Sequence, residues 1–95
     1  FMLTLPPVID AVAAGNTCVV KTSAYSPNTG YAVKRMIETI FPPEYVTVLT
    51  GGRDENACLL DEKFDYIFFT GSKKVGRLVL EKASKNLPPV TLELG

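Results

Sequence analysis

Histidine is absent from this sequence of 95 residues, and cysteine occurs only twice. Without histidine, the chain cannot hold a Ser-His-Asp or Cys-His catalytic unit, nor the usual zinc sites. Cys18 and Cys58 each stand in an apolar run, NTCVVK and ACLL. Such surroundings favour two buried, structural free thiols over one disulfide.

The sequence also lacks net charge and long apolar runs. Ten basic and ten acidic side chains cancel, so nothing attracts the whole chain to nucleic acid or membrane. No apolar run approaches the roughly 20 residues of a membrane-spanning helix, and the first residues lack the basic region of a signal peptide. Neither Phe1-Met2 nor Leu94-Gly95 resembles a natural terminus. We therefore expect one globular domain at most, cut from a larger protein.

The elements that are present alternate between helix and strand. Apolar periodicity, Pro and Gly predict helices over 5–14, 26–40 and 54–60 and a last helix around 75–83. Short β-branched or aromatic runs predict strands over 17–20, 45–49, 66–69 and 90–94. The order α-β-α-β-α-β-α-β predicts an α/β fold with an open parallel sheet and helices on both faces.

Ligands of open parallel sheets bind beyond the carboxyl ends of the strands. The four predicted ends are Lys21-Thr22-Ser23, Thr50-Gly51-Gly52, Thr70-Gly71-Ser72 and Glu93-Leu94-Gly95. Turn formation alone explains small residues at any one end about as well as a ligand does. It explains less well why a lysine and a glutamate stand at two of them.

The segment FFTGSKKVG ends an apolar strand and opens a helix with two lysines. Cations are the wrong sign for a helix N-terminus, so an anion held by Ser72 and the free N–H groups is one explanation. The segment is neither a G-x-G-x-x-G fingerprint nor a Walker loop. From spacing alone, a solvated basic helix face remains about as good an explanation.

Glu93 interrupts the apolar alternation of VTLELG, in which Val90, Leu92 and Leu94 share one face. A carboxylate there is either a solvated edge-strand group or a general base in a cleft. Pattern alone favours the edge-strand interpretation.

Taken together, the stretches AAGNTCVVKTS, YIFFTGSKKVG and PVTLELG resemble the aldehyde dehydrogenase superfamily, in its fatty- and aromatic-aldehyde (class 3) branch. The resemblance covers nearly the whole chain in order. It implies a Rossmann-like coenzyme-binding fold without the usual glycine fingerprint. It also implies oxidation of an aldehyde to a carboxylic acid with NAD or NADP, through a cysteine thioester that water hydrolyses.

The resemblance also implies roles for individual residues. Lys21 matches the lysine that binds the adenosine ribose, and Ser72 matches the serine at the pyrophosphate. Glu93 matches the general base for hydrolysis. The predicted cofactor-binding residues are Lys21, Ser23, Gly51, Gly71, Ser72 and Gly76. We expect no metal site.

Three departures from the family pattern matter. Lys-Pro-Ser-Glu is usual where this chain has Lys21-Thr22-Ser23-Ala24. The ribose-binding glutamate is thus Ala24, and we expect NADP to be accepted at least as readily as NAD. The nucleophilic cysteine lies downstream in another domain, and neither Cys18 nor Cys58 matches it. The asparagine of the oxyanion hole falls before Phe1.

Residues 1–95 are therefore expected to form part of one NAD(P)-binding domain, inactive alone. The expected partners are an aldehyde substrate, the remainder of a parent enzyme and a second copy of that enzyme, without nucleic acid. The expected location is cytoplasmic, with membrane association possible through a segment elsewhere in the parent. The alternatives are a non-catalytic nucleotide-binding α/β module and a plain α/β interaction domain.

Overall fold

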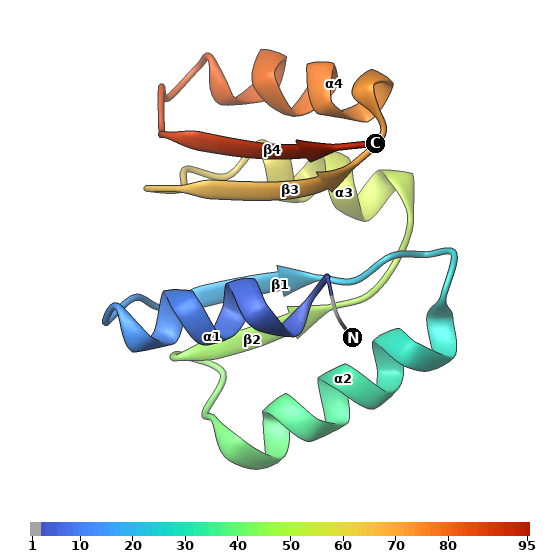
Figure 1. Ribbon diagram of the computed structural model, residues 1–95, viewed down its shortest axis with the longest axis vertical. Helices are drawn as coiled ribbons and strands as arrows, with labels where there is room; N and C mark the ends of the chain where they lie inside the picture. The colour runs from blue at the N-terminus through green and yellow to red at the C-terminus, as the bar shows by residue number, and fades with distance from the viewer. Residues whose placement is uncertain (1–2) are drawn as a thin grey trace. The chain divides into compact units, whose positions relative to one another are not determined.

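The computed structural model describes residues 3–95, and Figure 1 shows their helices and strands in the alternating order that the sequence predicts. Phe1 and Met2, on which the expectation of a truncated start partly rests, lie outside the described residues. The chain divides into two compact units, residues 1–56 and 57–95. No helix within residues 3–95 combines the length and the apolar character that crossing a membrane requires.

The first unit holds α1 (Leu5–Ala13), β1 (Cys18–Lys21), α2 (Pro27–Ile40) and β2 (Val46–Leu49). Pro6 and Pro7 lie in the first turn of α1, where a missing N–H leaves no broken hydrogen bond. Gly15 follows the helix with φ +89°, a left-handed conformation that suits glycine. Pro27 opens α2 as predicted, although the Ser26 side chain makes no capping hydrogen bond.

β1 and β2 pair in parallel, with Cys18 opposite Val46 and Lys21 opposite Leu49. β1 begins and ends one residue later than predicted, at Cys18 and Lys21. Lys21 belongs to the strand because its backbone still pairs with β2, opposite Leu49. Parallel register places Val20 and Val48 side by side on one face.

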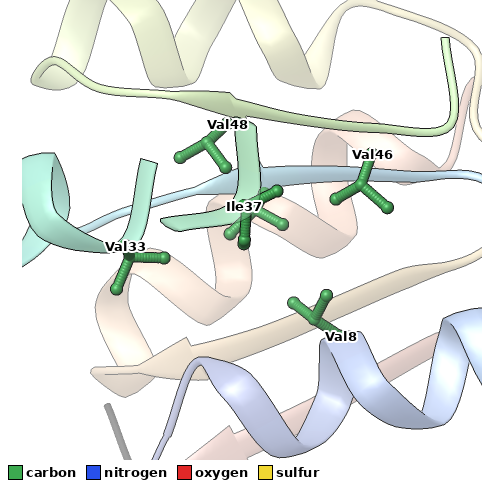
Figure 2. Packing of buried hydrophobic residues seen from close by; sticks show 6 residues of the cluster. Val8, Val33, Ile37, Val46 and Val48 are labelled. Carbon is green, nitrogen blue, oxygen red and sulfur yellow. The ribbon is translucent and has the colours of Figure 1, made fainter. Parts of the chain in front are cut away.

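That face carries the hydrophobic core of the first unit. Val46 and Val48 are fully buried, and Val33 and Ile37 of α2 are nearly so. Val8 of α1 joins the same cluster (Figure 2). Branched side chains from α1, α2, β1 and β2 therefore pack into one core that holds the first unit together. Burying each of these side chains stabilises the fold by about 1.5–3 kcal/mol.

The second unit contains β3 (Ile67–Gly71), α4 (Lys73–Ala83) and β4 (Val90–Leu94). β3 and β4 pair in parallel from Ile67 opposite Val90 to Gly71 opposite Leu94, and α4 packs against both strands. Its buried residues are fewer and smaller: Gly76, Val79 and Ala83, all from α4.

Helix α3 (Arg53–Leu60) runs from the first unit into the second and has no buried residue. The parallel α/β class is confirmed. The strands form two ladders of two, β1–β2 and β3–β4, where the sequence predicted one sheet. Helix–strand alternation indicates that strands run parallel, but it does not determine which strands become hydrogen-bonded neighbours.

Candidate functional site

The predicted site residues fall into two groups, one in each unit. In the first unit, Lys21 is the last residue of β1, and Ser23 and Gly51 follow β1 and β2. In the second unit, Gly71 ends β3 and Glu93 lies in β4, while Ser72 and Gly76 belong to the start of α4. Each group lies at or next to the carboxyl ends of its two strands, where open α/β sheets bind ligands.

The Lys21 ammonium group joins the two loops of the first unit. Its Nζ donates to the carbonyl oxygen of Thr22 at 2.7 Å and to that of Gly51 at 2.8 Å. Partial burial lowers the pKa of this amine, and the nearby Glu55 carboxylate opposes that shift. An ammonium has three N–H donors. Two are used within the chain, which leaves one for a ligand.

A cavity of about 140 Å³ opens beside this lysine, lined by Thr22, Ser23, Ala24, Pro27, Tyr31, Thr50 and Gly51. Pockets that enclose a drug-sized ligand measure roughly 300–1,000 Å³. The cavity therefore has room for one part of a dinucleotide, such as a ribose. Hydroxyl and backbone groups from Thr22, Ser23 and Thr50 suit a sugar, whereas Pro27 and Tyr31 offer apolar contact.

The floor of this cavity depends on a close approach between α2 and the loop after β1. Thr22 is buried, and a Cβ at Gly30 would lie 2.7 Å from its Oγ1 atom. Ser23 lies further out, and its Oγ accepts a hydrogen bond from the backbone N–H of Tyr25 at 3.1 Å. Ser23 is thus fixed by its own turn and lines the cavity.

The loop after β2 is a Gly51–Gly52 turn closed by Glu55. Gly51 has φ +131°, and Glu55 Oε2 accepts from the Gly52 N–H at 3.0 Å. This is the N3-to-N-cap half of a capping box, which holds the start of α3. Sequence reasoning missed Glu55. The signal was the spacing Gly52-x-x-Glu55 directly before a helix, with glycine in the place usually taken by Ser or Thr.

In the second unit, Ser72 is the N-cap of α4. Its Oγ accepts from the Val75 N–H at 3.2 Å, so the hydroxyl hydrogen stays available to a ligand. Lys73 and Lys74 follow in the first helical turn and are exposed, and that turn has no acidic side chain. The start of α4 therefore combines free N–H groups, a hydroxyl and two cations, all of which favour an anion.

The two glycines of this segment have distinct packing environments. A Cβ at Gly76 would lie 2.9 Å from Leu94 Cδ2, so Gly76 allows α4 to lie close against β4. A Cβ at Gly71 would lie 2.6 Å from the tip of the Phe69 ring. Packing thus gives both positions a reason to be glycine, alongside the cofactor role that the resemblance implies.

Glu93 lies on β4 in register with Thr70 of β3. Successive side chains of a strand point to opposite faces. Because α4 packs on Leu92 and Leu94, Glu93 lies on the face away from that helix. Its side chain is exposed, and within residues 3–95 its carboxylate makes no hydrogen bond or salt bridge. In the described residues this carboxylate is therefore in contact with solvent, as the edge-strand interpretation expects.

Both cysteines are free, as predicted, but only Cys18 is partly buried. Burial raises the pKa of the Cys18 thiol, which makes it a poor nucleophile. The prediction that Cys58 is buried is wrong. On the short helix α3, the partly covered residues are Asn56, Leu59 and Leu60, at i, i+3 and i+4, and Cys58 falls outside this stripe. Within the described part of the chain, no three His, Cys, Asp or Glu residues lie close enough to hold a metal ion.

Comparison with known protein families identifies the family to which this chain is related. The sequence model of the aldehyde dehydrogenase family matches residues 1–95, the whole chain. The chain belongs to the aldehyde dehydrogenase family. It is 47% identical over its full length to 4,4'-diaponeurosporen-aldehyde dehydrogenase of Staphylococcus aureus, and 43% identical to aldehyde dehydrogenase family 3 member A2 of Pongo abelii. It spans about a fifth of each of these relatives, 21% and 20%.

Solved aldehyde dehydrogenase structures agree with this assignment. A substrate-bound Staphylococcus aureus enzyme matches the whole chain with a TM-score of 0.97 at 47% identity, over 21% of that enzyme. A Mycobacterium tuberculosis aldehyde dehydrogenase complexed with NAD+ matches 86% of the chain with a TM-score of 0.75 at 38% identity, over 17% of its own length. A Streptococcus pyogenes succinic semialdehyde dehydrogenase with NADP+ matches 85%, with a TM-score of 0.71 at 29% identity, over 18% of its length.

Proposed function

We propose that this chain is part of the coenzyme-binding domain of an enzyme that oxidises aldehydes to carboxylic acids with NAD or NADP. The observation that carries the proposal is the Lys21 ammonium, fixed by the Thr22 and Gly51 carbonyls beside a ribose-sized cavity at the ends of two parallel strands. Membership of the aldehyde dehydrogenase family supplies the reaction class.

Different residues of the chain bind different parts of the cofactor. Lys21 and Ser23 bind the adenosine ribose, while Gly51 holds Lys21 through its carbonyl group. Ser72 and the free N–H groups at the start of α4 hold the pyrophosphate. Gly76 lets α4 lie close against β4, and Gly71, at the end of β3, lets the cofactor approach beside Ser72. The list of proposed cofactor-binding residues is thus Lys21, Ser23, Gly51, Gly71, Ser72 and Gly76.

When bound, NAD or NADP accepts the hydride that leaves the aldehyde carbon. Glu93 takes a proton from the water whose oxygen then attacks the acyl carbon of the thioester, so that the C–S bond breaks, the carboxylic acid forms and the cysteine leaves as a thiolate. The sulfur of that thioester belongs to a cysteine outside residues 1–95, so the chain alone is inactive. The Glu93 side chain is exposed on β4, so its carboxylate is accessible to such a water molecule.

The remaining features of the complete enzyme are proposals of the same kind. Residues 1–95 form part of one NAD(P)-binding domain, and a separate domain supplies the cysteine. The complete enzyme is a homodimer in the cytoplasm and has no nucleic-acid partner. The balanced charge of the chain, ten basic against ten acidic residues, supports the last point.

The experiment is an assay of the complete enzyme that carries these residues. Fatty and aromatic aldehydes are mixed with NAD or NADP, and reduced nicotinamide is followed by absorbance. The proposal predicts reduction that requires both aldehyde and enzyme, with the carboxylic acid as product. Cofactor binding without aldehyde-dependent reduction would contradict it and favour the non-catalytic nucleotide-binding module.

A further inference from the structure

The side chain of Glu55 folds over the loop that borders the cavity of the first unit. Its Oε2 accepts from the Gly52 N–H at 3.0 Å. An ideal Cβ at Gly51 would lie only 2.5 Å from the Glu55 Cδ atom. The carboxyl group therefore lies directly against Gly51, which is itself a lining residue of the cavity.

Gly51 contacts both an anionic and a cationic side chain. Its backbone carbonyl accepts from Lys21 Nζ at 2.8 Å, while its Cα side faces the Glu55 carboxyl group. The backbone N–H groups of Glu55 and Gly52 lower the pKa of the Glu55 carboxyl, and the charge of Lys21 adds to that shift. Glu55 is therefore ionised at neutral pH, and its negative charge offsets the positive charge of Lys21.

This charge arrangement bears on the position where the family pattern is broken. Ala24 lines the cavity without any charge of its own. Alone, Lys21 would attract a ligand with an extra phosphate on its ribose. The Glu55 carboxylate lies against Gly51, which lines the cavity, and a like charge there disfavours an added phosphate.

We propose that Glu55 is a specificity-determining residue that disfavours cofactors carrying a phosphate on the adenosine ribose and so restores part of the discrimination that Ala24 lacks. This inference rests on the proposed function, because it assumes that the cavity receives the ribose. The family pattern has a ribose-binding glutamate at the position of Ala24, in the loop after β1. The inference assigns part of that glutamate's role to Glu55, which closes the loop after β2.

The test is isothermal titration calorimetry of NAD and of NADP into the complete enzyme, without aldehyde. Glu55→Gln keeps an oxygen acceptor for the Gly52 N–H and removes only the charge. It is expected to lower the ratio Kd(NADP)/Kd(NAD) about 3- to 10-fold, the size expected of one partly screened charge. The Kd of NAD should change less than about twofold, because the acceptor for the Gly52 N–H is kept.

A matched control is Asp54→Asn, which removes the same charge one residue earlier in the first turn of α3. Asp54 makes no hydrogen bond to the Gly51–Gly52 turn within the described residues, so the ratio should stay as in the parent. Glu55→Met, which removes both charge and acceptor, should lower the ratio and also weaken both cofactors. The thermal midpoint of each variant separates a folding defect, which weakens both cofactors, from loss of the charge, which changes their ratio.

An unchanged ratio in Glu55→Gln and Glu55→Met would overturn the proposal, as would an equal shift in Asp54→Asn. These outcomes leave the proposed function intact, since the parent still binds both cofactors. A parent enzyme that binds neither cofactor would refute the proposed function and this inference together.

Discussion

The two units hold their site residues in different ways. In the first unit, Lys21 is half-buried and tied to two backbone carbonyls, and the neighbouring loop is closed by Glu55. In the second, Ser72 and Glu93 are both exposed, and Ser72 is held by a single capping bond. The first unit also has the larger hydrophobic core. Six buried side chains form one cluster there, whereas the buried residues of the second unit are Gly76, Val79 and Ala83 of α4.

In the proposed roles, this difference separates Lys21, which is fixed before a ligand arrives, from Glu93, which is open to water; Ser72, proposed to bind the pyrophosphate, is exposed like Glu93. A binding group works best when its geometry is fixed before the ligand arrives, because less entropy is then lost on binding. A general base must instead reach water and a reacting group. Substitutions in the first unit should therefore affect cofactor affinity and stability, and substitution of Glu93 should affect turnover alone.

The largest expected effect is that of Glu93→Gln in the complete enzyme. General-base help is typically worth about 10²–10⁴-fold, so steady-state turnover should fall within that range. The variant should still release one burst of reduced cofactor per site, because only the later hydrolysis needs the base. Stopped-flow absorbance after mixing with aldehyde measures both phases.

Two outcomes would contradict this assignment. Turnover at the parent rate would make Glu93 an ordinary edge-strand carboxylate. Loss of the burst while cofactor still binds would place its action earlier, in activating the cysteine.

A second comparison concerns the cores. Val48→Ala, at a fully buried site in the first unit, should cost about 2–3 kcal/mol of local stability. Val79→Ala on α4 should cost about 1–2 kcal/mol, because the other buried residues of that helix, Gly76 and Ala83, are few and small. Hydrogen exchange of the β2 and β3 amides in the complete enzyme measures these losses separately. Equal losses would show that the two cores are equivalent.

The third prediction concerns cofactor choice. Ala24→Glu adds a carboxylate to the lining of the cavity and should shift preference toward NAD, by about tenfold or 1.4 kcal/mol. The ratio of kcat/KM for NAD and NADP measures the shift. The parent is expected to use NADP at least comparably to NAD. Rejection of NADP by the parent by several orders of magnitude would refute this expectation.

The smallest effects are expected for the cysteines. Cys18→Ala should lower stability by about 1 kcal/mol, because its half-buried side chain packs against the core of the first unit. Cys58→Ala should be near neutral, since its side chain is exposed. Both variants should keep their turnover. Complete loss of turnover in a folded Cys58→Ala enzyme would show that this thiol takes part in catalysis.

The sequence predicted the order of all eight elements, because Pro and Gly mark most of their ends and the apolar stripes of α2 and α4 have a helical period. It placed Glu93 on the opposite strand face from Leu92 and Leu94, as period-two alternation requires. It did not predict that Lys21 donates to the Gly51 carbonyl, because this contact joins residues 30 positions apart. It also missed Glu55, whose importance comes from the fold of a turn rather than from a motif.

The most direct test of this division of labour is calorimetric titration of NAD into three variants of the complete enzyme. Lys21→Met removes a charged donor and should weaken binding about 10- to 100-fold. Lys34→Met is the matched control, since Lys34 Nζ also donates to a backbone carbonyl at 3.0 Å, but its partner Val48, unlike Thr22 and Gly51, does not line the cavity. Lys34→Met and Glu93→Gln should both bind NAD as the parent does. Parent-like affinity in Lys21→Met, or an equal loss in Glu93→Gln, would contradict the account.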